Sequence, residues 1–123
     1  MYAMETEGTY TMAYMNKEMA AKIRNNLKAA FPKFKFSVRV EDYMAIRVAI
    51  KSAPIRFVDG DYATLSHMSL DKMQNADVYK KISDIVNADN YDNSNMMEDY
   101  HDVGYYVRIT QGDWNNEKPF ILA

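Results

Sequence analysis

The sequence contains no cysteine, only four glycines and three prolines, and no long apolar run. Without cysteine the chain can form no disulfide, no thiolate metal site and no cysteine nucleophile, and this composition favours a reducing compartment. The glycines are isolated, so neither a phosphate-binding loop nor a nucleophile elbow is present. No apolar stretch reaches the roughly 18 residues of a membrane span, and the N-terminus lacks the features of a signal peptide. We therefore expect a cytoplasmic protein.

Histidine is equally scarce, and its two copies are not placed at the spacing of a zinc site. Asp99, His101 and Asp102 could in principle bind a divalent metal ion, and Asp59-Gly60-Asp61 with His67 resembles a fragment of an oxygen-rich site. Segments rich in Asp and Asn more often form turns, however. We expect no catalytic residue, no metal and no cofactor. A metal-dependent enzyme centred on Asp99, His101 and Asp102 is kept as an alternative that ranks below the two functions given at the end of this section.

The length of 123 residues predicts one domain, and its charge is distributed unevenly. We expect a single α+β domain over residues 16–123, preceded at 1–15 by a loose leader or a short strand. Residues 17–56 contain ten Lys or Arg against three acidic residues, a local balance of +7, so the rest of the chain carries −9. Such a separation favours a charged macromolecular partner.

Hydrophobic periodicity predicts the elements. Asn16 is a plausible N-cap for a helix over 16–31, which Pro32 ends, and a second helix is predicted from 71 to 87. Two alternating strands over 34–51 turn at residues 41–43, a short strand is expected at 55–58, and another strand at 105–110. This order predicts a two-layer α+β sandwich, in which two helices pack on one face of a mainly antiparallel sheet of three or four strands.

The hairpin has an apolar face and a basic face. Its apolar positions predict the core, while Lys35, Arg39, Arg47 and Lys51 stand on the opposite face. Alternate residues lie roughly 7 Å apart along a strand, a spacing that can follow a phosphate backbone. Stacking of single-stranded bases would also need an aromatic residue on this face, which requires Tyr106 to lie beside the hairpin. A solvated basic surface is the plainer interpretation.

The acidic stretch offers a competing surface of opposite sign. Residues 84–102 contain six carboxylates and no Lys or Arg. Carboxylates displayed at intervals can imitate phosphates and occupy the nucleic-acid channel of another protein. The candidate partner-binding residues are Asp84, Asp89, Tyr91, Asp92, Glu98, Asp99, Tyr100 and Asp102.

Several segments recur together in one known family. They are KAAFPKFKFSVR at 28–39, NYDNSN at 90–95, DYHDVGYYV at 99–107, GDW at 112–114 and KPF at 118–120. Over roughly residues 16–120 the chain resembles the large polyvalent protein-associated domain, twenty-ninth of that series, of phages and conjugative elements. The resemblance implies a mobile-element protein of the bacterial cytoplasm, and no catalytic residues carry over from it.

Two functions follow as expectations. The first is a non-enzymatic inhibitor of a host defence protein or ribonucleoprotein complex, similar to an inhibitor of a CRISPR effector, that binds through the acidic surface. The alternative is a nucleic-acid-binding module that uses the basic face of the hairpin. No membrane partner is expected, and a homodimer could form through an exposed hairpin edge.

Overall fold

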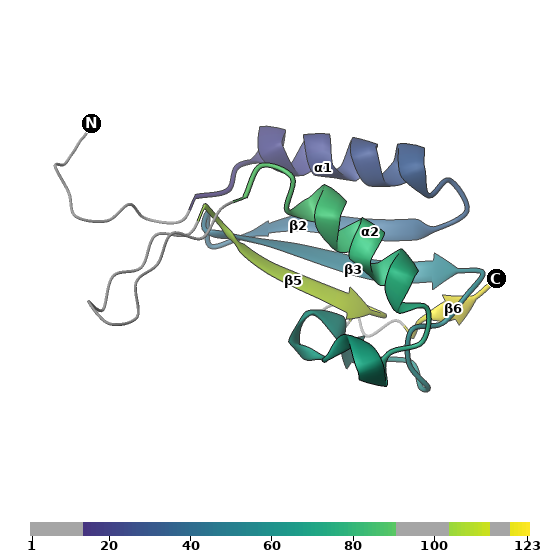
Figure 1. The fold of residues 1–123 in the computed structure, drawn as a ribbon. Coiled ribbons are helices and arrows are strands. Elements are labelled where there is room, and N and C mark those ends of the chain that lie inside the picture. The colour runs from purple at the N-terminus through teal and green to yellow at the C-terminus, as the bar shows by residue number, and fades with distance from the viewer. Residues whose placement is uncertain (1–13, 91–103, 114–118) are drawn as a thin grey trace, which may run out of the picture.

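The computed structural model describes residues 14–90, 104–113 and 119–123. Two helices lie against one face of a five-stranded sheet (Figure 1). In chain order the elements are α1 (Lys17–Ala30), β2 (Lys35–Glu41), β3 (Ala45–Ala53), β4 (Ala63–Thr64), two short 3-10 turns (Leu65–His67 and Leu70–Lys72), α2 (Ala76–Val86), β5 (Tyr106–Gln111) and β6 (Ile121–Leu122). The predicted α+β class is confirmed.

The sheet is mixed, whereas the sequence predicted a mainly antiparallel one. Its order is β2-β3-β5-β4, and β6 lies beside the end of β3. β2 pairs with β3 and β4 with β5 in antiparallel fashion, but β5 and β6 both run parallel to β3. A parallel return requires a crossover connection, and the chain makes it through α2. Alternating hydrophobicity reports which face a side chain occupies, so it could not reveal this direction.

The predicted first helix is confirmed. The side chain of Asn16 accepts a hydrogen bond of 2.8 Å from the Met19 amide, which caps one of the free N–H groups at the start of α1. Ala20, Ile23 and Leu27 recur at helical spacing and are buried against the sheet. The helix ends at Ala30, two residues before Pro32, as expected for a residue that cannot continue a helix.

The second helix begins later than predicted. Residues 70–72 form a 3-10 turn, and α2 starts only at Ala76, after Asn75 has adopted a left-handed conformation with φ 54°. The side chain of Asn75 donates to the Arg56 carbonyl at 2.7 Å and forms no capping hydrogen bond. Tertiary contact with the 54–62 segment therefore fixes this helix start. The predicted end near Asn87 is confirmed.

The strand predicted at 55–58 is wrong. The backbone amides of Phe57 and Val58 donate to the buried side chain of Gln111, at 2.9 and 3.3 Å. These amides are thus satisfied by a side chain from β5, and the segment forms bends. The short strand β4 follows it instead and pairs with β5.

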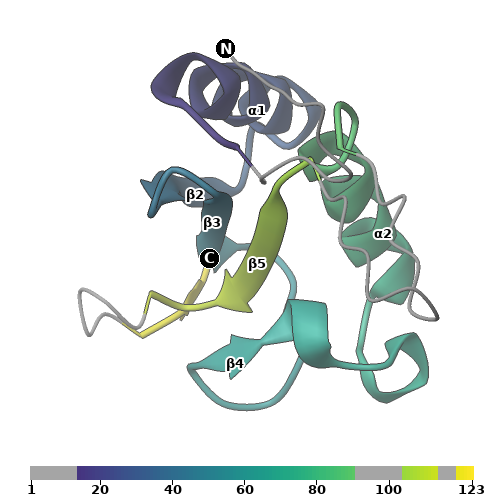
Figure 2. The ribbon, with the colours of Figure 1, turned by 90° about the vertical axis from the view of Figure 1, so that its left-hand side faces the viewer.

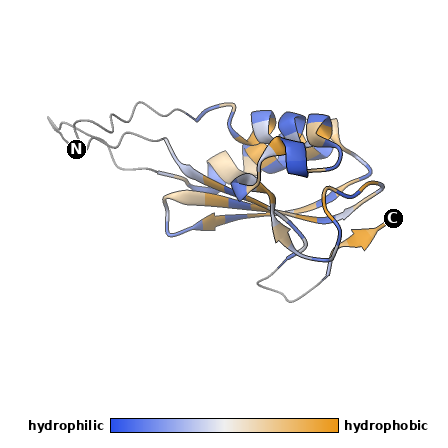
Figure 3. Ribbon diagram, turned by 60° about the horizontal axis from the view of Figure 1, so that its bottom comes forward, coloured by the Kyte–Doolittle hydropathy of each residue, from blue (hydrophilic) through white to orange (hydrophobic). Residues whose placement is uncertain are grey.

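The core lies between the sheet and the two helices. Figure 2 shows α1 above β2 and β3, and α2 beside β5. Figure 3 shows hydrophobic residues along the strands, while α1 carries hydrophobic and hydrophilic residues in turn. The largest fully buried side chains come from both layers. They include Leu27, Ile46, Val48, Ile50, Ile82, Val86 and Ile109.

Both chain ends of the described fold are attached to the sheet. Met15, within the expected leader, is fully buried, and its amide donates to the Tyr43 carbonyl at 2.8 Å. Residues 1–13 lie outside the described residues. Phe120 is buried, and β6 pairs with Ser52 and Ala53, so residues 120–122 pack against the rest of the fold. No helix in the described part of the chain is long and apolar enough to cross a membrane.

Candidate functional site

Three arginines stand in one row across three neighbouring strands. In the register of the sheet, Arg39 of β2 lies opposite Arg47 of β3, and Arg47 lies opposite Arg108 of β5. Directly paired residues share a face, and the flanking positions Val38, Val48 and Ile109 point into the core. The arginines therefore lie on the face turned away from α1 and α2, which we call the outer face.

The three arginines of this row differ in their surroundings. A guanidinium nitrogen of Arg39 lies 3.5 Å from Asp113, and Nε of Arg47 lies 3.5 Å from Glu41. Both distances exceed that of a good charge-assisted hydrogen bond. Arg108 is exposed and has no ion-pair partner within the described residues. Like charges directly opposite one another destabilise a sheet, so the row is a feature that folding alone does not favour.

Tyr106 is an aromatic residue on the outer face, where the stacking of single-stranded bases would need one. It pairs with Ala45 and, two residues before Arg108, shares the outer face. Its side chain is 51% exposed, unlike that of its neighbour Tyr105, which is buried. The outer face thus presents an exposed ring next to the arginine row.

The other two predicted cations lie at the open end of the hairpin. Lys35 and Lys51 line a concavity of about 320 Å³ together with Arg24 and Lys28 of α1 and the rings of Phe34 and Phe36. We call it the basic pocket. Its described lining contains four cations and no carboxylate. The four predicted basic residues therefore divide into two groups, Arg39 with Arg47 and Lys35 with Lys51.

Sequence reasoning missed three cations of these two groups. Arg24 and Lys28 lie on the outward side of the predicted helix, and helical spacing does not tell which outward side chains lie beside a strand edge. Arg108 joins the row only through the β3 and β5 register. Phe34 and Phe36 were assigned to the core, yet both are half-buried and also line the basic pocket.

The walls of the basic pocket are held in place by local contacts. A guanidinium nitrogen of Arg24 donates to the Val38 carbonyl at 2.8 Å. The ring centroids of Phe34 and Phe36 lie 5.8 Å apart in a stacked arrangement, and Phe31 lies 5.0 Å from Phe34. The aromatic cluster and the anchored guanidinium give the pocket a defined shape.

The predicted acidic surface is described only at its first two residues. Asp84 is exposed on α2, and Asp89 forms an exposed ion pair of 2.8 Å with Lys22 of α1. Tyr91, Asp92, Glu98, Asp99, Tyr100 and Asp102 lie outside the described residues. Asn90, within this stretch, exchanges two hydrogen bonds of 2.9 and 3.0 Å with the backbone of Tyr105, which follows the stretch.

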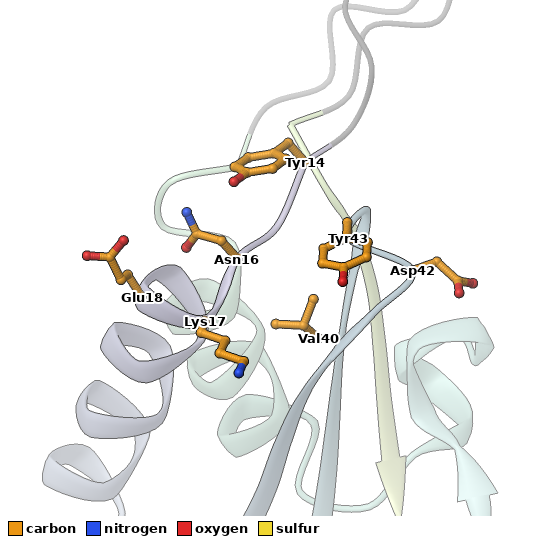
Figure 4. Close-up of a pocket in the computed structure, with 7 residues that line it drawn as sticks. All are labelled: Tyr14, Asn16, Lys17, Glu18, Val40, Asp42 and Tyr43. Carbon is orange, nitrogen blue, oxygen red and sulfur yellow. The ribbon is translucent and has the colours of Figure 1, made fainter.

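A second concavity, of about 640 Å³, lies at the turn of the hairpin. Its lining includes Tyr14, Lys17, Val40 and Tyr43, with Glu18 and Asp42 at its sides (Figure 4). Tyr43 has a positive φ of 58°, which is uncommon for a large side chain, and its ring is 77% exposed. The lining mixes both signs of charge, so it indicates no single class of ligand.

Metal-binding geometry is not found in the described ranges. No group of three or more His, Cys, Asp or Glu is gathered there. Asp59-Gly60-Asp61 is a turn, in which Gly60 has φ 96° and Asp59 accepts a hydrogen bond of 3.2 Å from Gln74. Asp99, His101 and Asp102 fall outside these ranges.

Comparison with known proteins identifies one family. The sequence matches the family described as large polyvalent protein associated domain 29 over residues 14–113. The match therefore spans α1 to β5 and includes both the arginine row and the basic pocket. Searches of curated proteins and of solved structures found no match.

Proposed function

This chain belongs to the large polyvalent protein associated domain 29 family, and we propose that it is a nucleic-acid-binding module. The contact surface is the outer face of the sheet, with the basic pocket at its end. The single observation that carries the proposal is the row of Arg39, Arg47 and Arg108 across three strands. We further propose that the protein acts in the cytoplasm of a bacterium, where phages and conjugative elements would deliver it.

The spacing of these cations suits a polyanion. Neighbouring strands lie about 4.8 Å apart, so the three arginines follow one another at short intervals across the sheet. Arg108 is exposed, the side chain of Arg39 is 39% exposed and that of Arg47 only 13%. Arginine binds phosphate oxygens in a bidentate geometry and also stacks on flat rings. A bound phosphate backbone would offset the repulsion between the paired arginines, which Glu41 and Asp113 only partly relieve at 3.5 Å.

The test is a salt titration of binding. Fluorescence anisotropy with labelled single-stranded and duplex oligonucleotides should show affinity that falls steeply with salt. Arg108→Thr should weaken binding several-fold, because it removes the exposed member of the row. Lys80→Ala is the matched control, since Lys80 is an exposed cation on α2, on the other side of the sheet. Absence of salt-sensitive binding, or equal effects of the two variants, would overturn the proposal.

A second candidate function is inhibition of a host defence complex through the acidic stretch, as by an inhibitor of a CRISPR effector. The family match and the run of six carboxylates without Lys or Arg favour it. Reversing the charge of Asp92, Glu98, Asp99 and Asp102 together should abolish inhibition in a bacterial defence assay. Inhibition that survives this change would exclude the acidic surface.

A further inference from the structure

The basic pocket has the chemistry of a nucleotide site. We propose that it binds one nucleotide unit of a single strand, with the phosphate among its cations and the base against Phe34 and Phe36. This inference rests on the proposed nucleic-acid function and assigns its substrate as single-stranded. It also assigns a role to Arg24 and Lys28, which come from α1 and not from the hairpin.

The positive charge of the residues that line the basic pocket favours an anionic ligand. Its cations come from α1, from β2 and from β3, so residues far apart in the sequence converge on one space. None of Lys28, Lys35 and Lys51 has an ion-pair partner within the described part of the chain. By contrast, Lys22, two residues before Arg24 on α1, is paired with Asp89. The lysines that line the pocket thus have no carboxylate partner among the described residues, so their charge is available to an anionic ligand.

Arg24 is oriented before any ligand arrives. Its hydrogen bond to the Val38 carbonyl uses one nitrogen of the guanidinium, and the remaining N–H groups are left for other acceptors. The same bond occupies a carbonyl of β2, the edge strand of the sheet. Occupying that carbonyl makes pairing with another strand at this point less favourable, which argues against a homodimer through the edge at Val38.

The size and the aromatic wall select a single strand. A volume of about 320 Å³ is at the lower end of the range for small-ligand sites, and it suits one nucleotide unit better than a stacked base pair. The bases of a duplex are stacked on one another and cannot reach a phenylalanine inside a pocket. An unpaired base can do so whatever its identity, because every base has a flat aromatic face. We therefore expect little sequence preference.

The experiment compares the pocket with the outer face in the same binding assay. The probes are a labelled single-stranded oligonucleotide, a duplex of equal length and an unlabelled mononucleotide as competitor. The pocket variants are the double change Lys28→Ala with Lys35→Ala, and Phe34→Leu. Lys33→Ala is the matched control, since Lys33 is exposed and next to the pocket but does not line it. Circular dichroism verifies that each variant is folded.

The pocket variants should lose affinity in different ways. The double lysine variant should weaken single-strand binding at least tenfold and reduce the slope of log affinity against log salt by about 1.4, corresponding to two phosphate contacts. Phe34→Leu should weaken single-strand binding about fivefold or more but leave the salt slope and duplex binding unchanged, because it removes stacking and no charge. Lys33→Ala should change neither quantity appreciably.

The possible failures can be told apart. If Arg108→Thr weakens binding while both pocket variants bind as the parent protein does, the pocket assignment is overturned and the proposed function stands. If no oligonucleotide binds in a salt-sensitive manner, both are overturned. If the mononucleotide competes as strongly as the oligonucleotide, the ligand is a free nucleotide and the single-strand assignment is overturned.

Discussion

Gln111 is the residue on which the 54–62 segment depends. Its side chain is fully buried and makes four hydrogen bonds to backbone groups of Phe57, Val58 and Gly60. The amide group thus satisfies two donors and two acceptors that no strand partner reaches. A glutamine at the end of an alternating strand gives no sign of this role in the sequence, which is why the segment was predicted as a strand.

Gln111→Ala should therefore destabilise the fold strongly. The change leaves a buried N–H and carbonyls unpaired and creates a cavity, so we expect a loss of about 2 to 4 kcal/mol in the free energy of unfolding. The measurement is urea denaturation followed by circular dichroism. Gln74→Ala is the control, because Gln74 is exposed and makes one side-chain bond, to Asp59. Its expected cost is below about 0.5 kcal/mol, and equal costs would contradict this role.

Two glycines allow backbone strain to be separated from crowding. Gly60 and Gly112 both have positive φ, of 96° and 82°. A Cβ at Gly60 would meet no atom within 4 Å, whereas one at Gly112 would lie 2.2 Å from the Asp61 carbonyl oxygen. Gly60→Ala should cost about 1 kcal/mol through conformation alone. Gly112→Ala should cost at least about 2 kcal/mol more, since backbone must move.

Urea denaturation of the two alanine variants measures this difference directly. The melting temperature should follow the same order, with Gly112→Ala the lower of the two. Similar stabilities would mean that the close approach of Gly112 to Asp61 can relax without a loss of stability.

At the scale of elements, α2 and β5 are joined by side chains. Asn90 bonds to the backbone of Tyr105, and the Tyr105 hydroxyl donates to the Val86 carbonyl at 2.6 Å. Burial, and next the charge of Asp89, raise the pKa of Tyr105 above its usual 10.0, and burial also raises the pKa of Tyr79. In the unfolded chain both hydroxyls would lose their protons at lower pH than in the fold.

These shifts predict a loss of stability in alkali. Stability falls as pH rises wherever the folded state binds more protons than the unfolded state. Tyr79 and Tyr105 keep their protons longer in the folded state, so the free energy of unfolding should begin to fall near pH 10, the usual tyrosine pKa, and continue to fall through the raised pKa values. Tyr105→Phe should cost about 1 to 2 kcal/mol at pH 7, where the hydrogen bond is lost, and should make the alkaline decline shallower. Urea titrations between pH 7 and 11 measure both.

Local sequence patterns predicted where the helices and strands lie better than they predicted which strands pair with one another. The spacing of Ile23 and Leu27 identified α1, and alternation identified β2, β3 and β5, because each signal comes from one element facing the core. β4 contains only Ala63 and Thr64, too short for a period. The parallel pairing of β3 and β5 and the role of Gln111 depend on contacts between residues that lie 61 and 54 positions apart in the sequence, which no local pattern contains.

The candidate site was predicted in part for the same reason. Lys35, Arg39, Arg47 and Lys51 stand out because alternation separates them from the core. Arg24 and Lys28 become neighbours of Lys35 only when α1 packs over β2, and Arg108 becomes a neighbour of Arg47 only through the sheet register. Individual surface charges were therefore predictable, but their gathering into a pocket and a row was not.

At the scale of the whole molecule, the positive charges on the outer face lower the stability of the fold. Arg39, Arg47 and Arg108 repel across the strands, and removing Arg108, which is exposed, should relieve part of that repulsion. Threonine also suits an exposed strand position. Arg108→Thr is therefore expected to raise the free energy of unfolding by about 0.5 kcal/mol at low salt, with a smaller gain at high salt because screening weakens the repulsion.

The same variant should bind nucleic acid several-fold more weakly, so its two effects have opposite signs. Urea denaturation and anisotropy titrations at matched salt concentrations measure them together. If the outer face binds no nucleic acid, Arg108→Thr should raise the free energy of unfolding and leave oligonucleotide binding unchanged. If ion pairs of Arg108 stabilise the face, the same variant should lower the free energy of unfolding. A gain in stability accompanied by weaker binding is the result expected of a row of arginines that is kept for a polyanionic partner at a cost to the fold.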